Sequence, residues 1–338
     1  MYSVACNNRR APDESGDLQG FDFIGLFSQM RRSLTQWFRG CFLAALQSSG
    51  EAHVRSLHQG RYDLRALSKI NKALAPLIFT SPKTKDLTVD WANSASVFEL
   101  NKSLLMQHYG VGEEYTLGPH QGKHLIPPVP SRADMIHHCA DLLLAEKKKA
   151  EISCLDIGCG ASAILSLIGA AVYGWRVVAS DVSRAALDLA ELNVKTSAHR
   201  DRIFLRLQSN PTHIFRGVVR QEEYFDLTVC NPPFYSSQRE AQAASQRKIK
   251  NLGLGEKRNF GGTSDELWYK GGELAFIRRM IDESLLFRAQ LGWVTCLVSE
   301  KDHVEVLRAD LKAKGVTRVQ VVDFENGNKK ARVLAWHC

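Results

Sequence analysis

The sequence lacks the cysteine patterns that build disulfide frameworks or zinc sites. It has eight cysteines in 338 residues, but none form a Cys-x-x-Cys pair, and no cysteine–histidine cluster has the spacing of zinc ligands. Several cysteines lie in apolar, strand-like runs, where a thiol behaves as a small hydrophobic side chain. We therefore expect a cytoplasmic protein whose cysteines are core residues and which holds no metal.

Long apolar runs and internal repeats are also absent. No stretch approaches the roughly 20 residues that a membrane-spanning helix needs, so we expect no membrane partner. Residues 1–50 form a leader in which Asp13, Glu14, Asp17 and Asp22 argue against a transit peptide, whereas residues 30–50 contain three arginines and no acidic residue. The sequence leaves open whether this leader is a helical or disordered extension, or a presequence exposed by a mistaken start codon.

Acidic residues are outnumbered, with 36 against 44 lysines and arginines, a net charge of +8 and a pI of about 9.1. This balance suits a polyanion such as nucleic acid, although an unspecialised basic surface would have the same charge. The excess is concentrated at residues 52–83, where six basic residues face a single acidic one. Because Leu64, Leu67, Ile70 and Leu74 recur at helical spacing, we expect residues 51–130 to form a basic, mostly helical segment that binds the polyanion.

Short apolar strands alternate with helices in the remainder, residues 131–338, which we take as one α/β domain. An extended, proline-stiffened linker at 124–132 and a helix at 133–149 are expected to precede it. The predicted strands are residues 152–157, 175–180, 203–207, 224–230, 292–299, 317–324 and 331–337, and the predicted helices are 161–173, 184–194, 272–287 and 303–314. This alternation indicates a largely parallel sheet with helices on both faces.

The first strand of this domain runs into a glycine turn, Asp156-Ile-Gly-Cys-Gly160. Glycines between a strand and a helix let a ligand approach the backbone at a helix N-terminus. With Ala163, and with Asp181 at the end of the second strand, the turn also fits the fingerprint of dinucleotide dehydrogenases, and a plain tight turn stays open too. Asp156 favours a ligand with a cationic amino group instead.

The strand at 224–230 ends in Asn231-Pro-Pro-Phe234. Proline has no backbone N–H and cannot continue a central strand, so the chain must leave the sheet here. It leaves with an amide side chain, carbonyl oxygens and an aromatic ring, a set suited to holding a flat group that carries an amine. A turn residue, an edge-strand stop and a core phenylalanine are the ordinary alternatives for these positions.

Together these motifs resemble the S-adenosylmethionine-dependent amino-group methyltransferases. More specifically, six further stretches resemble the bacterial ribosomal RNA large subunit methyltransferase F family, which methylates an adenine N6 in 23S rRNA and has eukaryotic relatives acting on U6 snRNA and mRNA hairpins. These stretches are Arg61-Tyr-Asp-Leu64, Pro127-Pro-Val-Pro-Ser-Arg-Ala-Asp134, Asn251-Leu-Gly-Leu254, Asn259-Phe-Gly-Gly262, Glu266-Leu-Trp268 and Gly271-Gly-Glu-Leu-Ala-Phe-Ile277. The resemblance covers residues 55–338 but not the leader.

The resemblance implies a class I methyltransferase fold, a Rossmann-like sheet of about seven strands with one antiparallel strand, and S-adenosylmethionine as cofactor. For the chemistry we expect the Asn231 side-chain oxygen and the Pro232 carbonyl to orient the adenine amine, Phe234 to stack on the flipped base, and Pro233 to complete the motif. Neither a metal nor a covalent intermediate is needed, because catalysis is chiefly positioning. The expected cofactor-binding residues are Arg132, Asp156, Gly158, Gly160, Ala161, Ser162, Asp181 and Asn231.

Several of these positions have structural alternatives. Asp181 or Ser162 would cap a helix, and Arg132, assigned through the resemblance, would form a surface salt bridge. RNA is expected to contact a basic loop at residues 235–270 and the N-terminal segment, through Arg61, Arg247, Lys248, Lys250 and Arg258.

Rival functions are methylation of protein glutamine or DNA adenine, a nicotinamide-dependent dehydrogenase, and a non-catalytic RNA-binding protein. Methylation of another structured RNA, like U6 snRNA, also stays open. Nothing in the sequence demands a partner chain, so we expect a monomer.

Overall fold

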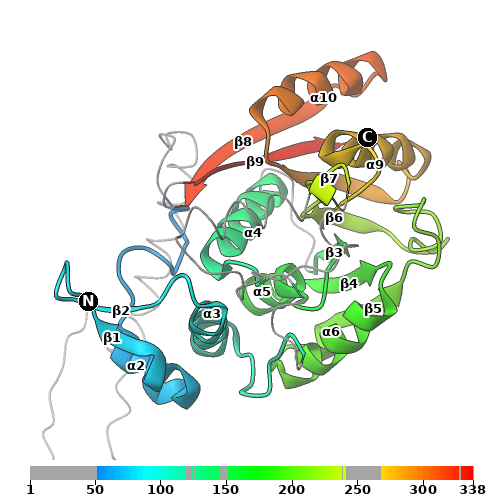
Figure 1. The fold of residues 1–338 in the computed structure, drawn as a ribbon. Coiled ribbons are helices and arrows are strands. Elements are labelled where there is room, and N and C mark those ends of the chain that lie inside the picture. Colours follow the sequence, from blue (N-terminus) through cyan, green and yellow to red (C-terminus); the bar gives the residue numbers. More distant parts are fainter. Residues whose placement is uncertain are drawn as a thin grey trace, which may run out of the picture. The chain divides into compact units, whose positions relative to one another are not determined.

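A seven-stranded sheet forms the centre of the structure, a computed structural model that describes residues 52–118, 124, 126–144, 151–237, 239–240, 268–326 and 329–337. The strand order is β5-β4-β3-β6-β7-β9-β8 (Figure 1). The bounds are β3 (Ser153–Ile157), β4 (Arg176–Asp181), β5 (Ile203–Leu207), β6 (Phe225–Cys230), β7 (Leu291–Val298), β8 (Arg318–Asn326) and β9 (Lys329–His337). In this sheet β9 runs antiparallel to both of its neighbours, β7 and β8, and the other adjacent pairs are parallel, which confirms the predicted fold class.

Helices cover both faces of the sheet, as the alternating pattern predicts. One core contains residues of α4 (Val129–Leu144), α5 (Ile164–Tyr173) and α6 (Arg184–Thr196), and the other contains residues of α9 (Gly272–Leu286) and α10 (Lys301–Ala313). Successive side chains of a strand point to opposite faces. Accordingly, Cys154 of β3 joins the first core and Leu155 joins the second.

The N-terminal segment contains α2 (Leu64–Ile70), the 3₁₀-helix η1 (Lys72–Leu77), a hairpin of β1 (Ile78–Thr80) and β2 (Leu87–Val89), and α3 (Ser94–Tyr109). Asp63 begins α2, because its side chain accepts the backbone N–H groups of Arg65 and Ala66. Leu67 and Leu104 are buried in the same core as α4 and α5, so this segment packs directly on the helices beside the sheet. The hairpin was not predicted, since three-residue strands carry too little periodicity to detect.

Two predicted boundaries are wrong near the glycine turn and the proline-rich stretch. Residues 129–132 are the start of α4 and not an extended linker. Proline is tolerated in a first helical turn, and the Asn101 side chain accepts the Val129 N–H at 2.8 Å. The helix predicted from residue 161 begins at Ile164 instead, because Ala163 adopts a left-handed φ of 46°.

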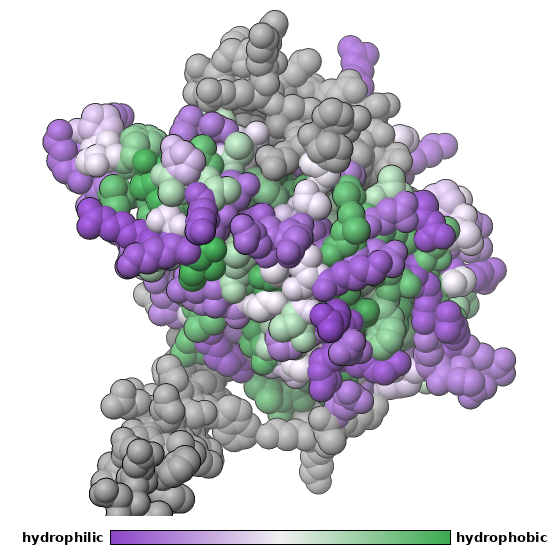
Figure 2. Space-filling view, turned by 90° about the horizontal axis from the view of Figure 1, so that it is seen from below, coloured by the Kyte–Doolittle hydropathy of each residue, from purple (hydrophilic) through white to green (hydrophobic). Residues whose placement is uncertain are grey.

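The surface mixes residue types. On the face that Figure 2 shows, hydrophilic and hydrophobic residues are interleaved. Exposed aromatic side chains include Phe79 and Trp91 of the N-terminal segment. Within the described ranges, no helix combines the length and apolar character needed to cross a bilayer.

Candidate active site

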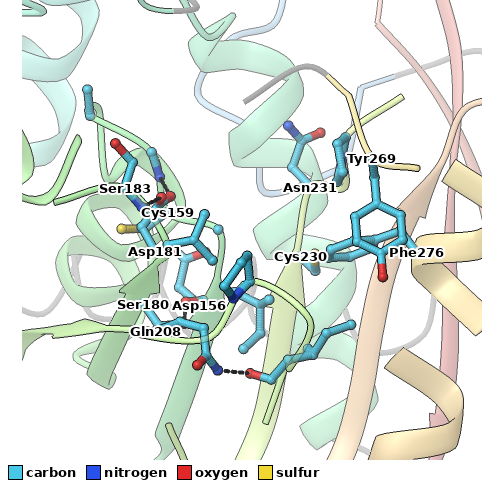
Figure 3. A pocket seen from close by; sticks show the side chains of 18 of the residues that line it. Asp156, Cys159, Ser180, Asp181, Ser183, Gln208, Cys230, Asn231, Tyr269 and Phe276 are labelled. Carbon is cyan, nitrogen blue, oxygen red and sulfur yellow. Dashed lines mark hydrogen bonds between the residues drawn. The ribbon is translucent and has the colours of Figure 1, made fainter. Parts of the chain in front are cut away.

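A cavity of about 830 Å³ lies at the carboxyl ends of β3, β4, β5 and β6 (Figure 3). The strand order reverses between β3 and β6, which is where open parallel sheets place their ligands. Residues from segments 156–165, 180–184, 207–214, 230–233 and 268–270 form its wall, together with Pro127, Arg132 and Phe276. The sequence motifs at 156–160, 180–181 and 231–233 therefore meet in one place.

The glycine turn is fixed to the end of β4 by backbone hydrogen bonds. Ser180 O accepts the N–H groups of Gly158 at 2.9 Å and Cys159 at 3.0 Å. Gly158 and Gly160 have φ angles of +72° and +61°, which glycine adopts without strain. A Cβ at Gly158 would meet no atom within 4 Å, so its backbone borders open space that a ligand can approach.

Asp181 links the two strand ends through its carboxylate. One oxygen accepts the Gly160 N–H at 2.9 Å and the other accepts the Ser183 N–H at 2.8 Å. The helix-cap alternative for Asp181 is wrong, because the N-cap of α6 is Ser183. Carboxylate oxygens keep further lone pairs, so Asp181 can still accept a ligand hydroxyl.

Asp156 is the least satisfied acid of the site. Its Oδ2 accepts the Ser166 hydroxyl at 2.7 Å, while its Oδ1 is shielded from solvent and has no hydrogen-bond partner among the described residues. Burial raises the pKa of this carboxyl to about 7. A buried carboxylate oxygen is stable when it accepts a hydrogen bond, and a cationic amino group is a donor that would also favour the charged form of Asp156.

Arg132 and Ser162 complete this end of the cavity. Both side chains are buried, each with 8% of its surface exposed, so the surface salt bridge considered for Arg132 is wrong. Burial lowers the pKa of the Arg132 guanidinium to about 10, and it stays charged at neutral pH. The N-cap residue of α5 is Ala163, so Ser162 does not cap this helix and the capping alternative is wrong. Ala161, also predicted at the site, accepts the Asn193 side-chain amide with its carbonyl oxygen at 2.8 Å.

Asn231 lies across the cavity from Asp181 and beside Tyr269 (Figure 3). Its Oδ1 is also shielded from solvent and has no hydrogen-bond partner among the described residues. Pro233 lines the cavity, whereas the buried Pro232 and the half-buried Phe234 are not among its lining residues. The structure therefore brings the side chains of Asn231 and Pro233, but not those of Pro232 and Phe234, to the cavity wall.

Sequence reasoning missed several wall residues. Gln208 directly follows β5, next to Asp181 at the end of β4, and its backbone N–H donates to Asp181 O at 2.8 Å. Its place after a parallel strand was the available signal. The segment 211–214 is held by Glu283 of α9, whose carboxylate accepts the N–H groups of Ile214 and Phe215, each at 2.9 Å. Trp268, Tyr269 and Phe276 supply aromatic wall. Trp268 and Tyr269 belong to the 235–270 loop that the sequence assigns to RNA, where aromatic residues are expected to stack on bases, and Phe276 belongs to a family-like stretch, but none is predicted as a cavity residue.

Of the five predicted RNA-binding residues, the structure describes only Arg61. Arg61 has 80% of its side chain exposed, forms an ion pair with Asp86 at 2.5 Å and does not line the cavity. Arg247, Lys248, Lys250 and Arg258 lie outside the described residues, as does most of the 235–270 loop.

A second polar cluster joins residues 53–55 to α4, outside the cavity wall. Ligand atoms of His53, His138 and Asp141 lie within 4.8 Å of one another, a spacing that a metal ion could use. The hydrogen bonds of His53 do not fit a metal ion. His53 Nδ1 accepts the Arg55 N–H at 3.1 Å, so the ring proton is on Nε2, which lies 2.9 Å from Asp141 Oδ2 and donates to it. Arg55 donates to the other Asp141 oxygen at 2.6 Å. The cluster therefore anchors the N-terminal segment.

Comparison with known proteins gives a consistent result. The sequence model of a family described as RNA methyltransferase matches residues 46–338. A ribosomal RNA large subunit methyltransferase F from Christiangramia forsetii is 40% identical over 294 residues, which is 84% of this chain and 99% of that protein. Another from Salmonella schwarzengrund is 42% identical over 295 residues, covering 86% and 94%. These relatives confirm the resemblance inferred from the motifs.

Solved structures show the same fold. The human Mettl16 catalytic domain in complex with MAT2A 3′UTR hairpin 1 is similar with a TM-score of 0.70 and 25% identity, covering 85% of this chain and 96% of that one. The N-terminal domain of human METTL16 in complex with SAH has a TM-score of 0.67 at 24% identity, covering 85% and 98%. The predicted class I methyltransferase fold is thereby confirmed.

Proposed function

Because the chain belongs to the RNA methyltransferase family, we propose that it methylates the exocyclic N6 of an adenine in large subunit ribosomal RNA. Its cofactor is S-adenosylmethionine, as in other methyltransferases of this fold. The observation that carries the proposal is a pair of solvent-shielded oxygens on residues that line one cavity, Asp156 Oδ1 and Asn231 Oδ1, neither of which has a hydrogen-bond partner in the part of the chain that the structure describes. The first suits a cationic amino group, and the second suits a neutral amine.

The end of the cavity at the glycine turn fits the cofactor. Asp156 would accept hydrogen bonds from its ammonium group, and Arg132 would contact its carboxylate. Asp181 would accept from the ribose hydroxyls, next to the open backbone at Gly158. When bound, S-adenosylmethionine supplies a methyl group that is already activated on a sulfonium centre.

The end of the cavity at Asn231 fits the acceptor amine. The exocyclic nitrogen of adenine is a poor nucleophile, because its lone pair is delocalised into the ring. Asn231 Oδ1 would accept one amine hydrogen, and the Pro232 carbonyl is the proposed acceptor for the second. Two fixed acceptors favour a pyramidal nitrogen whose lone pair is free to attack, so no strong base is required.

The target RNA is proposed from the relatives and from charge. The curated relatives are named for large subunit ribosomal RNA, and the solved Mettl16 domain binds an RNA hairpin. The basic residues of the N-terminal segment would contact phosphates, as the exposed Arg61 can. The target adenine would leave its stack to enter the cavity, with Phe234 stacking on it after a local shift.

The proposal is tested by methyl transfer from labelled cofactor into large subunit rRNA that lacks the modification, followed by digestion to nucleosides. Wild type is expected to produce N6-methyladenosine. Asn231 lies across the cavity from Asp181, so we propose that it contacts the amine and not the cofactor, although the sequence suggested both roles. For Asn231→Ala we therefore expect a rate at least 100-fold lower with an unchanged dissociation constant for SAH, because only the amine contact is removed. A different methylated nucleoside, or label in protein alone, would replace adenine N6 as the target.

A further inference from the structure

Trp268 carries a third polar atom without a partner at this cavity. The residue lines the wall, and its indole Nε1 is shielded from solvent with no hydrogen-bond partner among the described residues. A buried indole N–H normally has an acceptor. The wall around Asn231 and Trp268 therefore offers one unused acceptor, Asn231 Oδ1, and one unused donor, Trp268 Nε1.

The position of Trp268 is built by contacts on both sides of it. Trp268 forms a parallel β-bridge with Tyr235, and the Tyr269 N–H donates to Tyr235 O at 2.9 Å. The Tyr269 ring packs edge-on against Phe276 of α9, with ring centroids 5.3 Å apart. Residues 268–269 thus lie beside Tyr235, directly after Asn231-Pro-Pro-Phe234. This pairing fixes where Trp268 meets the cavity.

We propose that Trp268 reads the target base, by donating its indole N–H to a ring nitrogen of adenine while Asn231 accepts from the amine. The inference rests on the proposed function and adds a specificity residue to it. Adenine presents its amine donor between two ring acceptors, N1 and N7, and either would satisfy the indole. A donor and an acceptor on residues that line the same cavity provide the two groups that this edge of adenine requires.

The same pair would reject two of the other bases. Guanine and uracil each present a carbonyl where adenine has the amine, with an N–H next to it on the Watson–Crick edge, so both hydrogen bonds would be reversed if Trp268 donates to N1. If Trp268 donates to N7, guanine keeps that bond, uracil loses it, and both place a carbonyl against Asn231 Oδ1. Cytosine has the same order of groups as adenine on one edge, and only its smaller ring distinguishes it. A site that leaves buried polar atoms unpaired with the wrong base discriminates strongly against that base.

The test uses synthetic RNAs spanning the adenosine that wild type methylates in unmodified large subunit rRNA. That position carries adenosine, 1-deazaadenosine or 7-deazaadenosine, which remove one ring acceptor each and leave the amine. Wild type and Trp268→Phe are compared on all three RNAs by kcat/KM, and each enzyme is also titrated with SAH. Trp91→Phe is the control, since Trp91 is 61% exposed and lies outside the cavity wall.

Trp268→Phe is expected to lower kcat/KM on the adenosine RNA by roughly tenfold, with an unchanged SAH dissociation constant. On one of the two deaza RNAs, kcat/KM of wild type and of Trp91→Phe is expected to fall about tenfold relative to the adenosine RNA. On the same RNA, kcat/KM of Trp268→Phe is expected to fall no further, because this variant already lacks the hydrogen bond.

Three results would overturn the inference. They are an equal loss of kcat/KM by wild type and Trp268→Phe on the deaza RNA that slows wild type, no loss of kcat/KM by wild type on either deaza RNA, or weaker SAH binding by Trp268→Phe. The wild-type comparison stands even if the variant does not fold. If wild type methylates no adenosine in the unmodified large subunit rRNA from which these RNAs are designed, the proposed function itself is wrong.

Discussion

The two ends of the cavity are built in different ways. At the cofactor end, Gly158, Gly160 and Asp181 lie at two adjacent strand ends, where Ser180 O accepts the Gly158 N–H and the Asp181 carboxylate accepts the Gly160 N–H. At the amine end, Asn231 directly follows β6, whereas Trp268 lines the same cavity from a distant part of the chain and is placed by a β-bridge with Tyr235. The first end is fixed by a local motif and the second by a long-range return, so we expect separate substitutions to disable cofactor binding and methyl transfer.

The largest effect expected at the cofactor end is that of Asp156→Asn. Loss of the carboxylate removes the partner of the cofactor ammonium, so the SAH dissociation constant should rise about tenfold or more. At pH 8, the free energy of unfolding of ligand-free Asp156→Asn should be higher than that of ligand-free wild type. Burial raises the folded pKa of Asp156 from 3.8 to about 7, so wild type loses stability as pH rises through that window, and asparagine does not.

Calorimetry with SAH and thermal unfolding at pH 8 measure the two effects of Asp156→Asn. Ser166→Ala is the matched control, because it removes the hydroxyl that donates to Asp156 Oδ2 and keeps the carboxylate. An Asp156→Asn protein that binds SAH as tightly as wild type would remove Asp156 from the cofactor site.

A smaller effect is expected from pH in the wild-type protein. Only the ionised Asp156 can pair with an ammonium group, and its pKa is about 7 in the ligand-free protein. Cofactor affinity should therefore fall about tenfold from pH 7.5 to pH 6, as the carboxyl takes up a proton. Binding titrations across this range check it, and Asp156→Asn should give a flatter profile. Parallel profiles in both proteins would assign the pH dependence to another group.

The smallest effect is expected far from both ends, at Arg61. Its pair with Asp86 is exposed, so Arg61→Gln should leave thermal stability unchanged. If Arg61 contacts a phosphate, RNA affinity should fall about threefold and the slope of log K against log salt should decrease by about one. Arg308→Gln on α10 is the control, since Arg308 is similarly exposed in an ion pair with Glu305. Equal slopes for both variants would place Arg61 outside the RNA interface.

The cofactor end could be predicted closely from the sequence because its signals are local. A glycine turn after an apolar strand and an acid at the next strand end predict a ligand site, and the structure places Asp156, Gly158, Gly160 and Asp181 around one cavity. The sheet order and its antiparallel strand likewise agree with the family expectation. Parallel strands with short helical connections leave few other arrangements.

The rest depends on contacts between distant residues. The start of α4 at Val129 requires Asn101 of α3 as a hydrogen-bond partner, and the place of Trp268 requires Tyr235. Ala163 has a left-handed backbone conformation, so α5 begins after it. Alanine rarely adopts this conformation, and no pattern in the sequence predicts it here. Such features arise from tertiary packing, which single-sequence patterns do not encode.

The most direct test of the division between the two ends is a paired measurement on Asp156→Asn and Asn231→Ala. For each variant, the SAH dissociation constant is measured together with the methyl-transfer rate into unmodified large subunit rRNA at saturating cofactor. Asp156→Asn should bind SAH weakly and recover most of its rate at saturation, whereas Asn231→Ala should bind SAH normally and stay slow. Equal losses of affinity and rate in both variants would contradict two independent ends and indicate one cooperative site.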